Sequence, residues 1–380
     1  MTPSAEAQLV SLELSYSNPG ARSMGFGGAF AAQADDATAA FANPSGLVQL
    51  VRPEVSAEGR QWRFSIPYTA GGRLEGVPSG IGLDTELGLR IAESTADITG
   101  LSYLSFVYPK GSWSFAAYRH ELANFAFRGR TDALFADFPA DEGLDPSYAG
   151  VVRDQDVEAS LDLDVVGYGA ALAYRPLEAL SLGVGLVFSS GTMGAQNIEY
   201  RPDDESMESY FAPGSFLPER VEKRNHINMD GTDWTLNAGF LWSPGSQWRI
   251  GGFYCQGPTF DLEVIAGPGP AGPFIESGRQ ASPVSLPDVY GLGVACRTLA
   301  GRLTVAFDWA RVEYSTIFDG LDPVLRTEPT VDLEDGDELR LGAEVAILDK
   351  TPVIALRFGI WLDPDHRVRA RNDEPVSYTH

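Results

Sequence analysis

Large apolar residues alternate with small or polar ones along most of the chain from about residue 99 onward. The clearest stretch is PVIALRFGIWL at 352–362, where every second residue from Ile354 to Leu362 is large and apolar. The stretches 180–189, 234–242 and 338–347 repeat this pattern. Because successive side chains of a β-strand point to opposite faces, the period of two predicts an all-β fold.

The second face of these strands is unusual for a soluble protein. It carries mostly Gly, Ala, Ser and Thr, whereas the water-facing side of a soluble sandwich normally carries Lys, Glu and Thr. Small and polar residues suit the inside of a closed barrel, and large aliphatic residues with aromatics near strand ends suit a wall that faces lipid. The aromatic positions are Tyr168, Tyr174, Trp234, Trp242, Trp248, Tyr290, Trp309 and Trp361. The pattern favours an antiparallel transmembrane β-barrel, with a soluble sandwich as the alternative.

The connections between the predicted strands are alternately short and long. The short ones are near 108–112, 175–179, 243–247, 298–301 and 349–352. The long ones are near 67–98, 124–157, 190–228, 257–284, 315–336 and from 363 onward. This alternation is typical of an up-and-down outer-membrane barrel with periplasmic turns and extracellular loops. We count eleven strands, and since bacterial single-chain barrels have an even number, we expect C-terminal strands beyond those present here.

Composition and charge narrow the function classes. The chain has 380 residues, a formal net charge of −24, 41 Gly and 25 Pro. This acidity argues against nucleic acid as a partner, because phosphates need a basic face. Much of the acid lies in the long connections, where it forms either a solvated surface or a site for cations or lipopolysaccharide. Cys255 and Cys296 leave a disulfide open, and we expect no metal or other cofactor.

The N-terminus shows no complete export signal, but Ala5-Glu6-Ala7 has the small-x-small pattern of a cleavage site. We therefore interpret residues 1–7 as the remainder of an export region. No run of about eighteen apolar residues occurs, which excludes an ordinary transmembrane helix.

The stretch GGAFAAQADDATAAFANPSG at 27–46 fits neither a strand nor one continuous helix. Within NPGARSMGFGGAFAAQADDATAAFANPSGLVQLVRPEVSAEG at 18–59, it resembles the N-terminal region of the FadL and TodX family of outer-membrane transporters for long-chain fatty acids and hydrocarbons. Weaker similarities are AYRHELANF at 117–125, the stretch 230–260, SLPDVYGLGVA at 285–295 and DELRLGAEVAI at 337–347. Ser45 stands where the family has Ala.

The resemblance implies a fourteen-stranded barrel, of which three strands would be missing here. It implies that residues 8–50 form a hatch inside the lumen of a barrel made by residues 51–380. It also implies passive uptake of a hydrophobic molecule: capture by extracellular loops, an interior pocket beside the hatch, and lateral exit into lipid at an inward kink of the third strand. We expect a monomer in the outer membrane of a Gram-negative bacterium, in contact with its lipid and lipopolysaccharide.

Two groups of hatch residues carry alternative interpretations. Asp35 and Asp36 precede ATAAF, so they either cap a short helix or make a charge contact in the lumen. Asn43, Pro44, Ser45 and Gly46 fit a type I turn in which Asn43 caps its own backbone. By the resemblance, this turn is also a gate element that faces the opening at the third strand.

Arg119, His120, Glu121 and Asn124 interrupt SWSFAAY…FAF, which otherwise reads as a strand. Either a bulge or kink re-aims these side chains beside a functional site, or the strand ends there and its loop begins. The first interpretation places the lateral opening at these residues.

Five apolar residues lie in Pro- and Gly-rich stretches expected to be loops. They form either a groove that captures the ligand or contacts that pack the loops together. These residues are Phe211, Phe216, Leu217, Phe274 and Ile275.

No motif of a hydrolase, metalloprotease or nucleotide-binding enzyme occurs, and the chain has 4 His. We therefore expect a transport protein rather than an enzyme. The alternative is a secretion-associated or adhesive barrel that serves as a docking platform. An apolar lumen pocket beside the hatch would favour transport, and a polar plugged lumen with a large apolar patch on the loops would favour docking.

Overall fold

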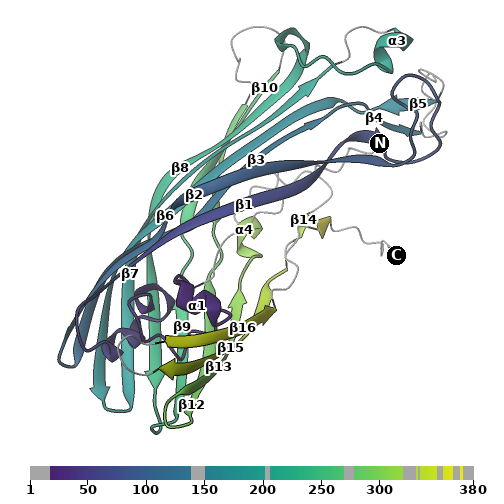
Figure 1. Ribbon diagram of the computed structural model, residues 1–380. Coiled ribbons are helices and arrows are strands. Elements are labelled where there is room, and N and C mark those ends of the chain that lie inside the picture. Colours follow the sequence, from purple (N-terminus) through teal and green to yellow (C-terminus); the bar gives the residue numbers. More distant parts are fainter. Residues whose placement is uncertain are drawn as a thin grey trace.

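The computed structural model describes residues 18–137, 150–201, 206–268, 278–319, 331–332, 334–348, 354–362 and 369–370. Its strands form one large, mainly antiparallel sheet that curves around a compact N-terminal segment (Figure 1). We call residues 18–50 the hatch segment. None of the helices in the described residues has both the length and the apolar character needed to cross a membrane.

The helical elements are α1 (Ala21–Gly25), α2 (Ala39–Ala42), η1 (Pro44–Gln49), α3 (Met207–Tyr210), η2 (Pro218–Arg220) and α4 (Thr316–Asp319). The first eight strands are β1 (Glu54–Arg73), β2 (Leu89–Lys110), β3 (Trp113–Thr131), β4 (Leu134–Asp137), β5 (Val151–Arg153), β6 (Asp156–Leu177), β7 (Leu180–Tyr200) and β8 (Val221–Trp242). The others are β9 (Trp248–Cys255), β10 (Thr259–Pro268), β11 (Gly278–Ser285), β12 (Val289–Thr298), β13 (Leu303–Val312), β14 (Val331–Asp332), β15 (Gly336–Leu348), β16 (Ile354–Leu362) and β17 (Arg369–Ala370).

The main sheet has fifteen strands in an up-and-down order. Of these, β4 and β5 are short additions at one edge, while β9 with β10 and β11 with β12 each make one interrupted pass. Eleven passes remain, which confirms the number that the alternation predicts. Within the described part of the chain, β16 pairs with β15 but not with β1.

The predicted short turns near 108–112, 175–179, 243–247 and 298–301 are confirmed, while 349–352 lies outside the described residues. The predicted long loops at 124–157, 190–228 and 257–284 are partly wrong, and most of 315–336 and of the chain from 363 onward lies outside the described residues. β3 continues to Thr131 and β6 begins at Asp156, so most of 124–157 outside the undescribed residues is strand. β7 and β8 likewise extend to Tyr200 and from Val221, and β10 and β11 occupy most of 257–284 apart from residues 269–277, which lie outside the described residues. The length of the loops was overestimated because these strand extensions carry polar residues on the outer face and apolar residues on the inner face, the reverse of the lower half.

The lower half of the wall, which contains the short turns, exposes a band of aliphatic side chains on its outer face. Two rows of aromatic residues border the band. Tyr168, Phe188 and Trp234 are direct neighbours across β6, β7 and β8 in the upper row, and Trp113 stacks on Tyr174 in the lower row. Trp234 and Trp242 lie eight residues apart, about 26 Å along the strand at ~3.3 Å per residue. For a strand tilted by about 35–45°, this length corresponds to a height of roughly 20 Å, which is close to the ~25 Å apolar band of an outer-membrane barrel.

Above the upper aromatic row the two faces exchange character. On β6, the outer face changes from Tyr168 and Val166 to Asp164 and Asp162, while the inner face changes from Gly167 to Leu163. The outer face of β1 and β2 is polar as well: the Arg63 Nε donates to Asp97 Oδ1 at 2.8 Å. The upper half of the wall therefore has the pattern of a sheet that meets water on its outer side.

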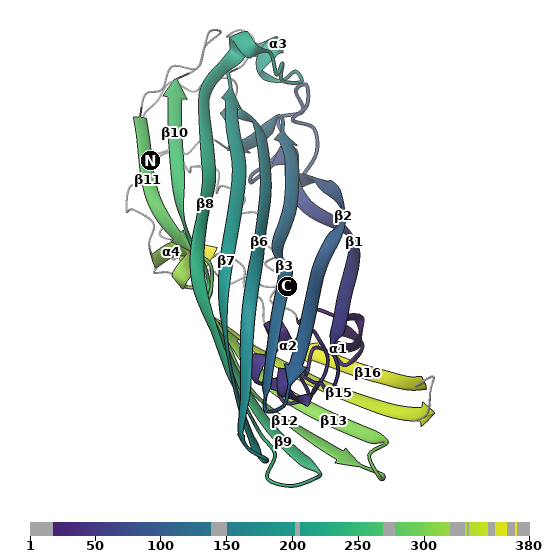
Figure 2. The same ribbon diagram turned by 90° about the vertical axis from the view of Figure 1, so that its left-hand side faces the viewer.

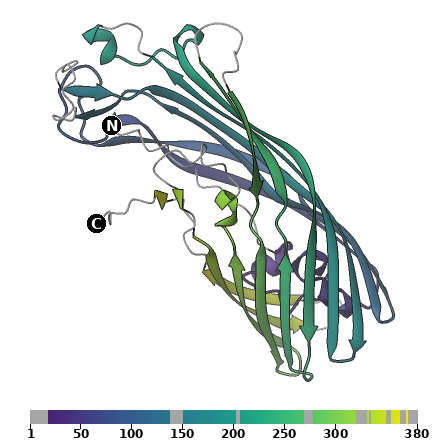
Figure 3. The same ribbon diagram turned by 180° about the vertical axis from the view of Figure 1, so that it is seen from behind.

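The hatch segment packs against the small residues of the lower inner face (Figures 2 and 3). Seen from behind, its purple helices lie among the lower ends of the strands (Figure 3). A Cβ added to any of five wall glycines would lie less than 3.0 Å from a hatch atom. These glycines are Gly183, Gly239, Gly251, Gly342 and Gly359. Their missing side chains allow the hatch backbone to contact the wall backbone.

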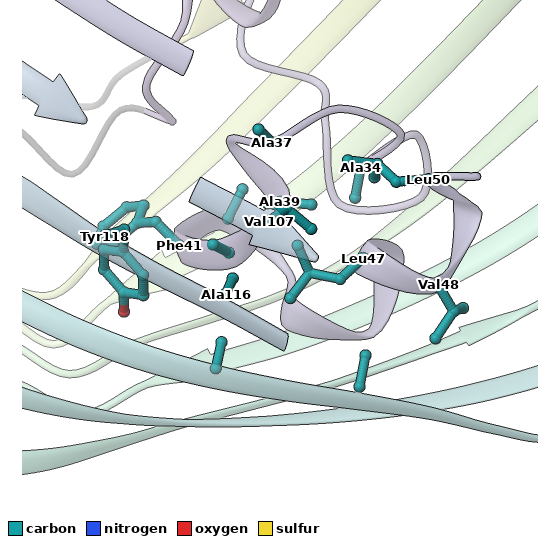
Figure 4. Packing of buried hydrophobic residues seen from close by; sticks show 14 of the residues in the cluster. Ala34, Ala37, Ala39, Phe41, Leu47, Val48, Leu50, Val107, Ala116 and Tyr118 are labelled. Carbon is teal, nitrogen blue, oxygen red and sulfur yellow. The ribbon is translucent and has the colours of Figure 1, made fainter. Parts of the chain in front are cut away.

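A cluster of buried apolar residues fixes the hatch segment against β2 and β3 (Figure 4). It combines Ala34, Ala39 and Leu47 of the hatch segment with Val107 and Ala116 of the wall. Alanine predominates because larger side chains would not fit between short helices and a sheet at interior packing density. The prediction that the small-residue segment fills the inside of the wall agrees with this packing.

Cys255 and Cys296 are both free, which resolves the disulfide that the sequence left open. In the β9–β12 ladder Cys255 is opposite Val289 and Cys296 is opposite Trp248. Cys296 lies seven positions after Val289, which corresponds to about 23 Å of strand, whereas a disulfide needs Cα atoms within ~7 Å.

The glycine contacts predict that Gly183→Val displaces the hatch segment. The new side chain would overlap Ser45 and Pro44, and overpacking of this kind typically costs about 1–3 kcal/mol or more. Limited proteolysis should cleave residues 18–50 faster in this variant, and pore conductance in a planar bilayer should rise. Gly194→Val is the matched control on the same strand, because a Cβ there meets nothing within 4 Å. Equal proteolysis of the two variants would contradict the contact.

The lipid-facing band predicts a strong position effect for arginine on the outer face of β8. Ala238 lies between the two aromatic rows, whereas Asp230 lies above them on the same face. Ala238→Arg should reduce the free energy of folding into vesicles by ~2–4 kcal/mol, and Asp230→Arg should change it by less than about 1 kcal/mol. Denaturant titration of tryptophan fluorescence in lipid vesicles measures both, and similar costs at the two positions would exclude the proposed band.

Candidate binding site

The Asn43–Gly46 turn folds as the sequence predicts. Asn43 accepts hydrogen bonds from Ser45 N at 3.2 Å and from Ser45 Oγ at 2.6 Å, and Pro44 begins the 3₁₀-helix η1. Pro suits this position because the first turn of a helix leaves its N–H groups unpaired, and Pro has no N–H to leave unpaired. A side chain at Gly46 would overlap the carbonyl of Ala34.

The closest wall contacts of Asn43 and Ser45 are with β8 and β7, although η1 as a whole also approaches β3. Asn43 Nδ2 donates to Ala31 O at 2.8 Å and to Phe240 O of β8 at 3.2 Å, and Asn43 is fully buried. Ser45 lies against Gly183 of β7. The expectation that Asn43, Pro44 and Ser45 face the third strand is therefore corrected, because the side chain of Asn43 is directed to β8.

The two aspartates divide between the two roles that the sequence left open. Asp36 Oδ1 accepts from Thr38 N at 2.9 Å and so caps the turn that leads into α2. Asp35 instead contacts Arg22 within the hatch segment and lies 3.6 Å from Arg297 of the wall.

Arg22 connects the hatch segment to β15. Its Nε and Nη2 atoms each donate to Glu344 at 3.0 Å, and Glu344 also accepts from Arg357 of β16. Burial disfavours the charged guanidinium, but the hydrogen bonds and charges of Glu344 and Asp35 outweigh that effect and raise the pKa of Arg22 above its ordinary value. At the other edge of the sheet, Ala37 N donates to Glu54 of β1 at 3.0 Å. The hatch segment thereby links both edges of the wall.

The third strand contains the predicted bulge. β3 runs through Arg119, His120, Glu121 and Asn124 without ending, and its register with β6 shifts between Glu121 and Ala123. Leu122 is thus the extra residue. The alternative in which the strand ends at these residues is wrong.

The ladder between β2 and β3 stops at the same level. The last pair is Tyr103 with His120, and β2 has its own bulge at Ser102, between Glu58–Tyr103 and Gly59–Leu101 of the β1 ladder. Above this point β2 stays with β1 and β3 stays with β6 (Figure 2). Bulges bend and twist strands, so two bulges on facing strands separate them.

Side chains rather than the backbone connect β1 and β2 to β3 above the bulges. Phe64 lies edge-on to Phe125 with ring centroids 6.1 Å apart, and the ring centroids of Tyr68 and Phe127 are 5.8 Å apart. Arg128 N donates to Ser94 Oγ at 2.8 Å. The wall at this position is therefore held by a few side-chain contacts instead of a continuous ladder.

A small cavity lies beside the hatch segment at the level of the bulges. Its volume is about 40 Å³, and it is lined mainly by apolar side chains together with the ring of His120. Phe41 of α2 lies over His120 with ring centroids 4.0 Å apart. The structure therefore brings Phe41, rather than Asn43, to the third strand.

Above the cavity, the inner face of the wall is mainly apolar. A second buried cluster contains aromatic and aliphatic residues from β3, β6, β8 and β10. These residues are Ala123, Phe125, Phe127, Leu163, Val165, Met229, Phe260 and Leu262, with Leu286 beside them. We call this the upper apolar lining. Sequence reasoning missed both Phe41 and this lining, although the reversed alternation of DVEASLDLDVV at 156–166 was a usable signal.

The five expected capture residues have different environments. Phe211 is buried against Phe135 with ring centroids 5.6 Å apart, so for this residue the loop-packing alternative holds. Phe216 contacts Tyr200, and Leu217 is exposed. Phe274 and Ile275 lie outside the described residues.

At the level of sequence, no protein-family model and no curated protein matches the chain. The structure is similar to a FadL homologue of Pseudomonas aeruginosa, with a TM-score of 0.58 at 14% identity over 92% of this chain and 81% of that one. It is also similar to the toluene transporter TodX of Pseudomonas putida, with a TM-score of 0.54 at 13% identity over 92% and 85% of the two chains. The chain has the FadL fold.

A TodX variant described as a monoaromatic hydrocarbon channel gives a TM-score of 0.60 at 14% identity, over 96% of this chain and 87% of that chain. TodX is thus described both as a toluene transporter and as a monoaromatic hydrocarbon channel. The described residues of the present chain hold no group of three or more His, Cys, Asp or Glu side chains that could bind a metal ion.

Asn43 predicts a test of hatch anchoring in this FadL fold. Asn43→Ala leaves Ala31 O and Phe240 O without their donor, and such a loss typically costs about 1–3 kcal/mol. Hydrogen exchange of residues 18–50 should accelerate, while exchange in the upper halves of β6 and β7 should not change. Asn197→Ala on β7, above the aromatic rows, is the control. Unchanged exchange in the hatch segment would show that Asn43 does not anchor it.

Proposed function

We propose that this protein mediates passive uptake of hydrophobic small molecules, such as long-chain fatty acids or hydrocarbons, across the outer membrane of a Gram-negative bacterium. The observation that carries the proposal is the mainly apolar inner face of the wall, which combines the upper apolar lining with the cavity beside Phe41 and His120. A barrel that serves only as a docking platform for partners at its loops would not need an apolar inner surface.

The driving force is the removal of apolar ligand surface from water, at about 25 cal/mol per Å². Capture would begin at the loop between β1 and β2, where several large apolar side chains are exposed, together with Leu217. The residues in and next to this loop are Leu74, Val77, Leu87, Leu89 and Ile91. Sequence reasoning did not identify them as capture residues.

Exit would be lateral, between β2 and β3 above Tyr103 and His120. Here the backbone ladder is absent, and the outer face of the neighbouring strands changes from polar to lipid-facing within two or three residues. A ligand that leaves into lipid keeps its apolar surface out of the periplasm, and each CH₂ kept from water is worth about 0.8 kcal/mol. In this scheme the hatch segment blocks the axial route.

The alternative, a docking platform, is favoured only by the exposed apolar loop residues. It would not require an apolar interior, a cavity or an interrupted ladder. We therefore place transport first, and contact of the protein with lipopolysaccharide remains a prediction.

Deletion of Leu122 tests the lateral route. Without this residue β3 would pair regularly with β6, and the inward residues on both sides of the bulge would keep their faces. The β2–β3 ladder could then extend past His120, and uptake of radiolabelled oleate or toluene by cells should fall at least about tenfold, which needs only ~1.4 kcal/mol of added barrier.

Leu122→Ala is the control, because it shortens the side chain and keeps the bulge. Heat-modifiable gel migration confirms that both variants are folded in the outer membrane. Undiminished uptake by the folded deletion variant would reject lateral exit, and equal uptake by cells with and without the wild-type protein would reject transport itself.

A further inference from the structure

His120 is a buried polar side chain without a polar partner. It is 1% exposed, and neither ring nitrogen has a hydrogen-bond partner among the described residues. One face of the ring is covered by Phe41, and the ring lines the cavity beside the hatch segment. Buried polar groups are nearly always hydrogen-bonded, so an unpaired one in a cavity wall indicates a group that meets a ligand.

The surroundings of His120 favour its uncharged form. Burial and the positive charges of Arg60 and Arg119 both disfavour a charged ring, and Glu121, the next residue in the chain, forms an ion pair with Arg119 at 3.7 Å. A buried charge without a counter-ion is strongly disfavoured. An uncharged imidazole offers one N–H donor and one nitrogen acceptor, which match a hydroxyl or a carbonyl group.

The rest of the cavity wall contains no charged side chain among the described residues. Two of its polar groups are already engaged: Asn237 Nδ2 donates to Tyr118 Oη at 3.2 Å, and Gln256 Oε1 accepts from Leu236 N at 3.2 Å. A carboxylate in this cavity would contact no cationic side chain of its lining, because the two arginines whose charges act on His120, Arg60 and Arg119, do not line it. An uncharged molecule with one polar atom could form a hydrogen bond with His120.

We propose that the cavity selects uncharged apolar molecules the size of one aromatic ring that carry a hydroxyl or carbonyl group, which hydrogen-bonds to His120. This inference rests on the proposed uptake function and names its substrate class. The cavity of about 40 Å³ is smaller than the ~150 Å³ of an apolar cavity that binds benzene. The ligand therefore enters when Phe41 moves aside, and its ring replaces that of Phe41 against His120 and Tyr118. Figure 4 shows Phe41 beside Tyr118.

Three molecules of nearly equal shape test the proposal: p-cresol, toluene and p-toluate at neutral pH. They carry a hydroxyl, no polar group and a carboxylate, respectively. Calorimetric titration of the detergent-purified protein should give p-cresol binding about three- to tenfold tighter than toluene, the ratio expected for one hydrogen bond, and p-toluate the weakest.

Variants of His120 separate recognition from folding. His120→Phe should abolish the preference for p-cresol over toluene while toluene still binds. His120→Gln keeps a donor and an acceptor and should retain at least part of the preference. His226→Gln, a histidine that does not line the cavity, is the matched control and should behave as wild type. Heat-modifiable gel migration shows that each variant is folded.

The outcomes distinguish this inference from the proposed function. Equal binding of p-cresol and toluene, tightest binding of p-toluate, or an unchanged preference in His120→Phe overturns the inference and leaves uptake standing. If none of the three molecules binds and none enters cells faster in the presence of the wild-type protein, uptake and this inference both fail.

Discussion

Backbone-to-backbone contact between the hatch segment and the wall is the constraint on which the rest of the structure depends. At Gly183, Gly342 and Gly359 the inner face of the wall has no side chain, and hatch atoms occupy that space. Several strands of the wall thus pack against the same hatch segment. This segment also connects β1 to β15 through Glu54 and Arg22. The aliphatic outer face, the small inner face and the alanine-rich hatch segment are three consequences of this one arrangement.

The outer face of each long strand meets lipid in its lower half and water in its upper half. This difference determines which parts of the strands the sequence could predict. In the lower half, lipid requires an apolar outer face, so the alternation predicted the strands, their turns and their faces. In the upper half, water requires a polar outer face and the apolar residues turn inward. On β6, Leu163 and Val166 thus carry apolar side chains on opposite faces of one continuous strand. The sequence pattern led to the expectation of apolar residues on the outer face along the whole strand. These extensions were therefore assigned to loops, and the upper apolar lining was missed.

The candidate site was predictable where local chemistry decides and unpredictable where packing decides. The turn at Asn43, the cap at Asp36 and the bulge near Glu121 follow from short-range rules and were anticipated. Phe41 was not, because its position against His120 depends on how α2 lies against β3. For Phe211 the sequence left ligand capture and loop packing open for the same reason, because its burial depends on Phe135, which is distant in the sequence.

The interrupted ladder between β2 and β3 needs support, because unpaired backbone groups in lipid cost several kcal/mol each. The structure supplies local partners on both strands. Arg119 Nη1 donates to Leu101 O, and Ser102 Oγ donates to Glu58 O at 3.1 Å. Arg119 also pairs with Glu121, so its charge is balanced at the point where the ladder stops. The polar residues that interrupt the apolar strand pattern therefore stabilise the separated strands directly. A regular strand would not need them, and this is the physical reason that their presence in the sequence marks the break.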